Sequence, residues 1–214
     1  MVRRISEYVP EWQMLGQPVA LAAAQAAGFA QDPPPLTADD LDDRPVLVLD
    51  FDGVVSPLPN TMTDKYERGR QFFQAGNKAY VYVLAGYGIG SNYWVPKDLI
   101  EAGPELEKKF QIVWASSWDF VCQPLGALFR VSPDLPWIDL VNGYATVERA
   151  QAIRRVVGEE RPVVWCDDQQ SSASQRYMSE RTGPTLCIRP AKRYGLRAKH
   201  LDRIFEFSRN PRSA

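Results

Sequence analysis

Aspartate and serine residues follow three short apolar segments of the chain, and their types suit phosphate and metal chemistry. These segments and the polar residues after them are 46–49 with Asp50-Phe-Asp52-Gly53, 111–115 with Ser116-Ser117, and 162–166 with Asp167-Asp168. A short, continuous apolar run rich in β-branched residues is typical of a strand buried on both faces of a parallel sheet. The carboxyl ends of parallel strands share one edge, where ligands bind, so we expect these polar side chains to converge there.

Four aspartate carboxylates at one sheet edge repel one another unless a positive charge neutralises them. Mg²⁺ prefers oxygen ligands and combines a few carboxylates with water and phosphate. We therefore expect a Mg²⁺ site formed by Asp50, Asp52, Asp167 and Asp168. Beside such an ion an aspartate can attack phosphorus as a nucleophile, while the ion offsets charge on the phosphoryl oxygens.

Ordinary structural interpretations of the same residues stay open. Asp50 and Asp52 beside Gly53 also suit a turn at a strand end. Ser116 suits a helix N-cap. The pair Asp167-Asp168 suits an acidic loop or cap.

Histidine and tryptophan residues add little to the predicted site. His200 is the only histidine, which excludes Ser-His-Asp and Cys-His catalysis. It lies among charged residues on a predicted helix, so we expect it at the surface. The tryptophans at 114, 118, 137 and 165 are interpreted as core residues or site walls.

The elements that must position these residues follow from the hydrophobic pattern. The predicted strands of one sheet are 46–49, 111–115, 162–166 and 185–188. The predicted helices are 146–157, 171–181, 196–208 and one near 98–109. Strands that alternate with helices predict βαβ units, so we expect an α/β fold: a Rossmann-like three-layer sandwich with a mostly parallel sheet. The alternating run 80–84, followed by the glycine-rich 86–90, predicts a strand in a hairpin.

The amino-terminal part differs from this core in composition. Residues 31–45 are rich in proline and acidic residues and are interpreted as a linker, because successive prolines cannot continue a helix. We therefore expect an N-terminal extension over 1–44 with a helix near 17–30, a catalytic core over 45–209 and a tail over 210–214.

Composition limits the classes of partner and compartment. The 214 residues include 25 Lys and Arg against 26 Asp and Glu, so net charge gives no support for broad binding to nucleic acid or membrane. The basic cluster after residue 189 is interpreted as a solvated face rather than as a contact for an anionic substrate.

No apolar run has the ~18 residues of a membrane span, and Glu7 and Pro10 interrupt the pattern of a signal peptide. Three widely spaced cysteines predict a reducing, cytoplasmic location.

The three polar strand ends resemble, in order, motifs of the haloacid dehalogenase-like (HAD) superfamily. Asp50-Phe-Asp-Gly-Val-Val resembles the first motif, Trp114-Ala-Ser116 the second, and Val163-Val-Trp-Cys-Asp167-Asp168 the fourth. The resemblance covers residues 45–209. Arg161-Pro-Val-Val-Trp-Cys-Asp-Asp168, with the later Gly195-Leu196, is similar to a small-cap bacterial subset that includes HAD domains associated with RNA-repair proteins.

The resemblance implies a role for each matched residue. Asp50 resembles the nucleophile that becomes an aspartyl phosphate, and Asp52 the general acid/base whose main-chain carbonyl also binds Mg²⁺. Ser116, with Ser117 beside it, resembles the phosphate-binding residue. Asp167 and Asp168 would complete the metal site. An acid at position 52 is a feature of the phosphatases rather than the dehalogenases of this superfamily.

The third motif, normally a lysine or arginine that neutralises the aspartate and the phosphate, departs from the family pattern. The predicted helix 146–157 contains no lysine, and its cations are Arg149, Arg154 and Arg155. Arg149 lies nearest the expected position, although a solvated helix face explains it equally well. The resemblance therefore implies a Mg²⁺-dependent phosphatase with a minimal cap, acting on a small phosphorylated molecule or a nucleic-acid end. The alternative is a catalytically weak or inactive HAD-like binding or scaffold module.

Overall fold

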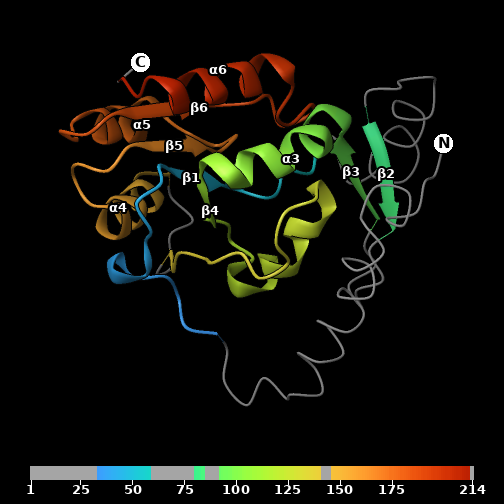
Figure 1. Ribbon diagram of the computed structural model, residues 1–214, viewed down its shortest axis with the longest axis horizontal. Helices are drawn as coiled ribbons and strands as arrows, with labels where there is room; N and C mark the ends of the chain where they lie inside the picture. The colour runs from blue at the N-terminus through green and yellow to red at the C-terminus, as the bar shows by residue number, and fades with distance from the viewer. Residues whose placement is uncertain (1–32, 59–79, 85–91, 141–145, 213–214) are drawn as a thin grey trace.

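The computed structural model describes residues 33–58, 80–84, 92–140 and 146–212 (Figure 1). These residues form an α/β structure with helices on both faces of a sheet, as the alternating pattern predicts. The predicted helix near 17–30 and the glycine-rich turn at 86–90 lie outside the described residues. Within the described ranges, no helix combines the length and the apolar character needed to span a membrane.

Four short strands form a parallel sheet in the described part of the chain. In spatial order they are β4 (Gln111–Trp114), β1 (Val46–Leu49), β5 (Val163–Cys166) and β6 (Thr185–Ile188). The register aligns Leu49 at the end of β1 with Trp114 and with Cys166. The residues that follow these three strands therefore leave the sheet at the same edge.

Helices cover the two faces of the sheet and complete a three-layer arrangement. On one face, Leu47 and Leu49 share a core with α3 (Lys97–Lys109), the 3-10 segment η4 (Asp119–Phe129) and α6 (Ala198–Arg209). On the other face, Val46 and Val48 pack with α4 (Thr146–Val157) and α5 (Ser172–Ser179). Both faces of β1 are fully buried, which explains its continuously apolar sequence.

A hairpin separate from the main sheet precedes α3. The strands β2 (Tyr80–Leu84) and β3 (Asn92–Pro96) pair in antiparallel fashion, which confirms the hairpin predicted for this region. Since β3 ends at Pro96 and α3 begins at Lys97, the hairpin is joined directly to the helix that covers the sheet (Figure 1).

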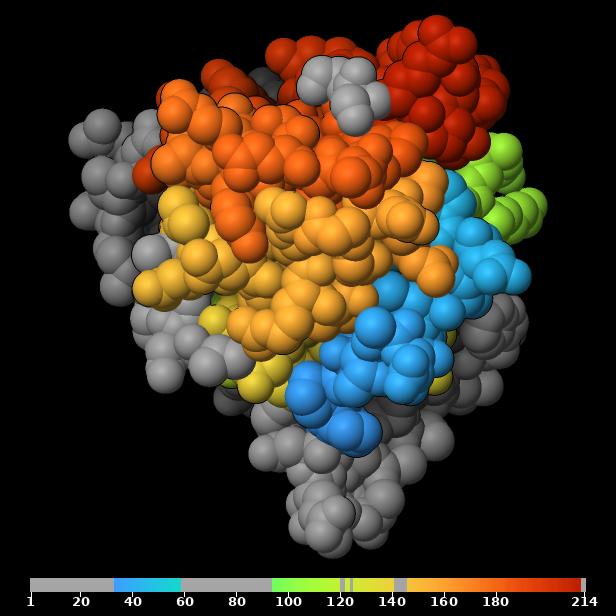
Figure 2. All heavy atoms as spheres, turned by 90° about the vertical axis from the view of Figure 1, so that its left-hand side faces the viewer, coloured from blue at the N-terminus to red at the C-terminus, as the bar shows by residue number. Residues whose placement is uncertain are grey.

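The described part of the predicted linker packs against the core. Leu36 is buried in the same cluster as α4, and its main-chain N–H donates to the Trp137 carbonyl at 2.8 Å. The short η2 (Ala38–Asp40) contacts α4, and Figure 2 shows the blue segment 33–58 beside the yellow-orange surface of that helix. Farther along, the Asp42 N–H donates to Gln111 Oε1 at 2.8 Å. These contacts extend the ordered structure to at least residue 33.

His200 is buried, which corrects its expected surface position. It lies in the first turn of α6, and its Nδ1 accepts the main-chain N–H of Arg197 at 3.1 Å. The adjacent Lys199 is exposed, while the imidazole satisfies an N–H group at the start of the helix.

Candidate active site

Polar residues from the ends of three strands meet at the carboxyl edge of the sheet. Asp50 follows the central strand β1, and Ser116 and Asp167 follow its two neighbours, β4 and β5. All three side chains are buried. The main-chain N–H of Asp50 donates to the Cys166 carbonyl at 3.0 Å, so the ladder between β1 and β5 continues to the first residue of the site.

Arg149 provides the buried positive charge at this edge. It lies in the first turn of α4, is 3% exposed, and its Nη1 donates to Asp50 Oδ2 at 2.9 Å and to Asp167 Oδ2 at 3.1 Å. This burial excludes the solvated helix face as an explanation of Arg149. Burial alone would lower the pKa of the guanidinium, but the charges of Asp50 and Asp167 outweigh it and raise that pKa.

The carboxyl groups at this edge remain short of positive charge. Burial, reinforced by the charge of Asp167, raises the pKa of Asp50 to about 7 despite the opposing effect of Arg149. Burial and the charge of Asp167 likewise raise the pKa of Asp168 to about 6. Arg149, with a smaller contribution from Lys192 at Asp168, therefore does not compensate the three carboxylates, and additional positive charge would favour their ionised forms.

Gly53 allows the Asp168 carboxylate to approach the loop after β1. A Cβ atom on Gly53 would lie 2.6 Å from the Asp168 Cγ and 2.8 and 2.9 Å from its two oxygens. The φ of Gly53 is +76°, a region that side chains disfavour. The glycine of the Asp-x-Asp-Gly segment thus serves both the turn and the packing of the carboxylate cluster.

The donor set and its unsatisfied atoms fit a hard divalent cation. Asp50, Asp167 and Asp168 each offer a carboxylate oxygen, and these oxygens lie within 4.8 Å of one another. Asp168 Oδ1 is buried and has no hydrogen-bond partner among the described residues. Buried polar atoms of this kind are costly unless a ligand satisfies them. Carboxylate oxygens short of positive charge are what Mg²⁺ prefers, so these three residues fit the predicted ion.

Two further predicted residues differ in placement. Within the described ranges, the buried Ser116 Oγ has no partner of full hydrogen-bond geometry, yet it lies near enough to the Asp50 carboxyl to lower the pKa of that group. Ser117 is exposed and lies outside this buried group. A phosphoryl oxygen next to Asp50 would give the Ser116 hydroxyl an acceptor.

Asp52 is half-buried and does not belong to the cluster of three carboxylates. It is held by Trp118, which the sequence suggested only as a core residue or a site wall. The Trp118 indole Nε1–H donates to Asp52 Oδ2 at 3.0 Å. Trp118 follows Ser116 by two residues, just as Asp52 follows Asp50 by two, so paired strand ends bring them together. That equal spacing is the signal by which sequence reasoning could have selected Trp118.

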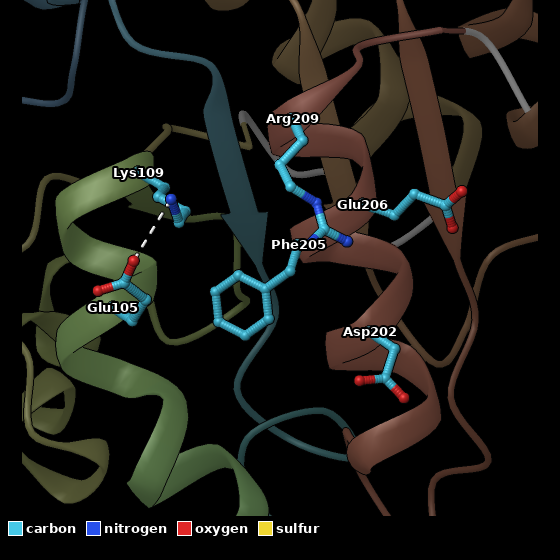
Figure 3. A pocket seen from close by; sticks show the side chains of 6 residues that line it. All are labelled: Glu105, Lys109, Asp202, Phe205, Glu206 and Arg209. Atoms are coloured by element: carbon cyan, nitrogen blue, oxygen red, sulfur yellow. Dashed lines mark ion pairs between the residues drawn. The ribbon is translucent and has the colours of Figure 1, made fainter.

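A surface groove between α3 and α6 is separate from this site. Figure 3 shows the residues that line it, Glu105, Lys109, Asp202, Phe205, Glu206 and Arg209. None of them belongs to the carboxylate cluster. The groove borders the end of α3 that leads into β4, and hence the amino edge of the sheet. Its charges are mixed, and the Glu105–Lys109 ion pair at 3.3 Å crosses one turn of α3.

Comparisons of the chain with protein-family models, curated proteins and solved structures found no significant match.

Proposed function

We propose that this protein is a Mg²⁺-dependent phosphatase of the HAD type that hydrolyses phosphate monoesters through a phosphorylated Asp50. The observation that carries the proposal is a buried cluster of three aspartates around one guanidinium, with Arg149 bridging Asp50 and Asp167. Arg149 supplies the positive charge that the third motif requires, and this favours an enzyme over an inactive binding module.

In the first half of the reaction, Asp50 acts as the nucleophile. A carboxylate oxygen of Asp50 attacks phosphorus, the bond from phosphorus to the leaving oxygen breaks, and that oxygen takes a proton from the Asp52 carboxyl. Arg149 and the Ser116 hydroxyl stabilise the charge on the phosphoryl oxygens. In the second half, Asp52 removes a proton from water, the water oxygen attacks phosphorus, and the bond to Asp50 breaks.

Asp50, Asp167 and Asp168 would hold the Mg²⁺ ion, together with the main-chain carbonyl of Asp52 that the family resemblance implies. When bound, the ion supplies positive charge to the phosphoryl group and to the carboxylates. The raised pKa of Asp50 is relevant here, because a protonated carboxyl is a poor nucleophile.

The proposed substrate is a phosphorylated small molecule or a nucleic-acid end. The β2–β3 hairpin lies in the segment between the first and second motifs, where the family resemblance places a cap, and a small cap leaves room for a bulky leaving group.

All three cysteines are free, which agrees with the predicted cytoplasmic location.

The decisive experiment measures hydrolysis of phenyl phosphate by the wild type and Asp50→Asn, with Mg²⁺ and with EDTA. We expect Mg²⁺-dependent turnover by the wild type and turnover at background for Asp50→Asn, because an amide cannot form the phosphoenzyme. Asp43→Asn is the matched control, since Asp43 is exposed at the other end of β1. Equal rates for the wild type and Asp50→Asn would refute the assigned nucleophile.

A further inference from the structure

Trp118 and Asp52 form a contact between the two loops that frame the site. Besides its 3.0 Å hydrogen bond to Asp52 Oδ2, the Trp118 indole packs against Phe51, with ring centroids 5.5 Å apart and planes inclined by 60°. Phe51 is fully buried and Trp118 is half-buried. The indole is therefore anchored by a buried aromatic ring, while its N–H holds the Asp52 carboxyl group.

The loop that carries Trp118 is tightly turned. The Asp119 N–H donates to the Ser116 carbonyl at 3.1 Å, which closes a turn over residues 116–119. Asp119 then adopts φ +50°, a left-handed conformation that is uncommon outside glycine. The turn joins Ser116, a predicted phosphate ligand, to Trp118, so both side chains are placed by the same four residues.

Resting on the proposed function, we infer that Trp118 is a positioning residue for Asp52 in proton transfer to the leaving group. The indole N–H donates to Oδ2 and therefore favours the exchangeable proton on Oδ1. This arrangement fixes both the orientation of the carboxyl group and the oxygen that delivers the proton. Oδ1–H gives its proton to the leaving oxygen as the phosphorus–oxygen bond breaks, and the electron pair of that bond stays on the leaving oxygen.

The inference predicts an effect that depends on the leaving group. A basic alkoxide needs protonation as it leaves, whereas an acidic phenol such as p-nitrophenol leaves readily without it. Loss of a positioning contact should therefore slow hydrolysis of an alkyl phosphate much more than hydrolysis of an aryl phosphate. Loss of packing alone would slow both to the same extent.

The test compares kcat for glycerol phosphate and p-nitrophenyl phosphate in Trp118→Phe, which keeps an aromatic ring against Phe51 and removes the N–H. Because general acid catalysis typically contributes about 10²- to 10⁴-fold, we expect about a tenfold loss with the alkyl phosphate and less than about threefold with the aryl phosphate. Trp137→Phe is the matched control: it removes an indole hydrogen bond to the Pro33 carbonyl and leaves the contact between Trp118 and Asp52 in place. Its ratio of alkyl to aryl rates should equal that of the wild type.

A double-mutant cycle separates positioning from packing. In an Asp52→Asn background, Trp118→Phe should cause no further change in the ratio of alkyl to aryl rates, because the group it positions no longer donates a proton. Equal losses with both substrates in Trp118→Phe, or the same selective loss in the Asp52→Asn background, would overturn the inference and leave the proposed function intact. Absence of Mg²⁺-dependent turnover in the wild type would refute the proposed function itself.

A second measurement does not depend on the folding of Trp118→Phe. The chain has six tryptophans, and Asp52→Asn in the ¹⁵N-labelled protein should shift the indole N–H signal of Trp118 more than those of the other tryptophans. If no indole signal moves, the hydrogen bond to Asp52 is absent and the inference is wrong.

Discussion

Two arginines with nearly equal burial lie at opposite edges of the same sheet and have different surroundings. At the carboxyl edge, Arg149 is 3% exposed and contacts the carboxylates of Asp50 and Asp167. At the amino edge, Arg181 is 4% exposed and donates to neutral oxygens, the Gly158 and Arg161 carbonyls and Thr185 Oγ1. The pKa of Arg149 is raised, while burial lowers that of Arg181.

The contrast separates the arginine to which we assign a role in the proposed chemistry, Arg149, from one with a structural role, Arg181. Arg181 ties the start of β6 to the turn between α4 and β5, and its oxygens are supplied by the fold itself. Arg149 instead contacts Asp50 and Asp167, two residues that also fit as ligands of a cation and as neighbours of a bound phosphate. Burial of a guanidinium is therefore no guide to function by itself; the chemical nature of its acceptors is the informative observation.

The largest expected effect comes from removing the charge at the carboxyl edge. Arg149→Met should lower kcat for phenyl phosphate by about 10²- to 10³-fold, as expected for loss of an electrostatic donor to the transition state. The variant should also be destabilised without Mg²⁺, because Asp50 and Asp167 lose their buried partner, and Mg²⁺ should restore part of that stability. Steady-state kinetics and urea unfolding with and without Mg²⁺ measure both effects.

The control for that variant is Arg155→Met on the same helix, where the side chain is exposed. Its kcat and unfolding free energy should match the wild type. A kcat for Arg149→Met within about twofold of the wild type would contradict the assigned role, since a typical oxyanion donor contributes far more.

The next effect tests the amino edge. Arg181 uses Nε, Nη1 and Nη2 for three separate acceptors, a fork that lysine cannot reproduce. Arg181→Lys should therefore lower the unfolding free energy by about 2 kcal/mol through lost hydrogen bonds. Its kcat should not change, because the substitution is remote from the carboxylate cluster. Urea unfolding and phenyl phosphate hydrolysis give the two readouts, and a selective loss of kcat would contradict the architectural role.

Replacing arginine by lysine at the carboxyl edge should lower the unfolding free energy less than Arg181→Lys does, and should lower kcat less than Arg149→Met does. Arg149 reaches both Asp50 and Asp167 through the single atom Nη1, so one ammonium group can replace it. Arg149→Lys should keep kcat within about tenfold of the wild type, because the charge is retained while its reach changes. Kinetics at saturating Mg²⁺ provide the measurement. A loss as large as that of Arg149→Met would show that guanidinium geometry, rather than charge, is required.

The hydrophobic pattern predicted the main sheet because its strands are buried on both faces. Each of the four strands is a short apolar run, and the polar residues that follow them mark the carboxyl edge. The helix pattern located α4, and the family resemblance selected Arg149 over Arg154 and Arg155 as the site cation. Its burial against Asp50 could not be predicted from the pattern, because it depends on how the helix is rotated against the sheet.

Two other residues show how little helix and strand periodicity reports. Trp118 belongs to a tight turn, so only its equal offset from the paired strand end, and no periodicity, marks its contact with Asp52. His200 has charged neighbours, yet its place in the first turn of α6 makes it an acceptor for the Arg197 N–H. The surroundings of Trp118 and of His200 are each set by a hydrogen bond that depends on the folded structure.

His200 is a third buried base, and unlike Arg149 and Arg181 it titrates within the experimentally accessible pH range. Burial, with the charges of Lys199, Arg203 and Arg197, lowers the pKa of His200 to about 4, and no carboxylate in the described part of the chain opposes these effects as Asp50 and Asp167 do at Arg149. A protonated Nδ1 could not accept the Arg197 N–H. The unfolded chain takes up this proton near its ordinary pKa of about 6.5, so the folded state loses stability as pH falls from about 6.5 towards 4.

We expect the unfolding free energy of His200→Asn, which keeps a side-chain acceptor without a titrating group, to fall less steeply between about pH 7 and pH 5 than that of the wild type. The difference in slope should correspond to a fraction of one proton taken up on unfolding. Urea unfolding at several pH values measures the slope. Parallel curves for the two proteins would show that His200 titrates equally in the folded and unfolded chains and that its burial does not control its charge.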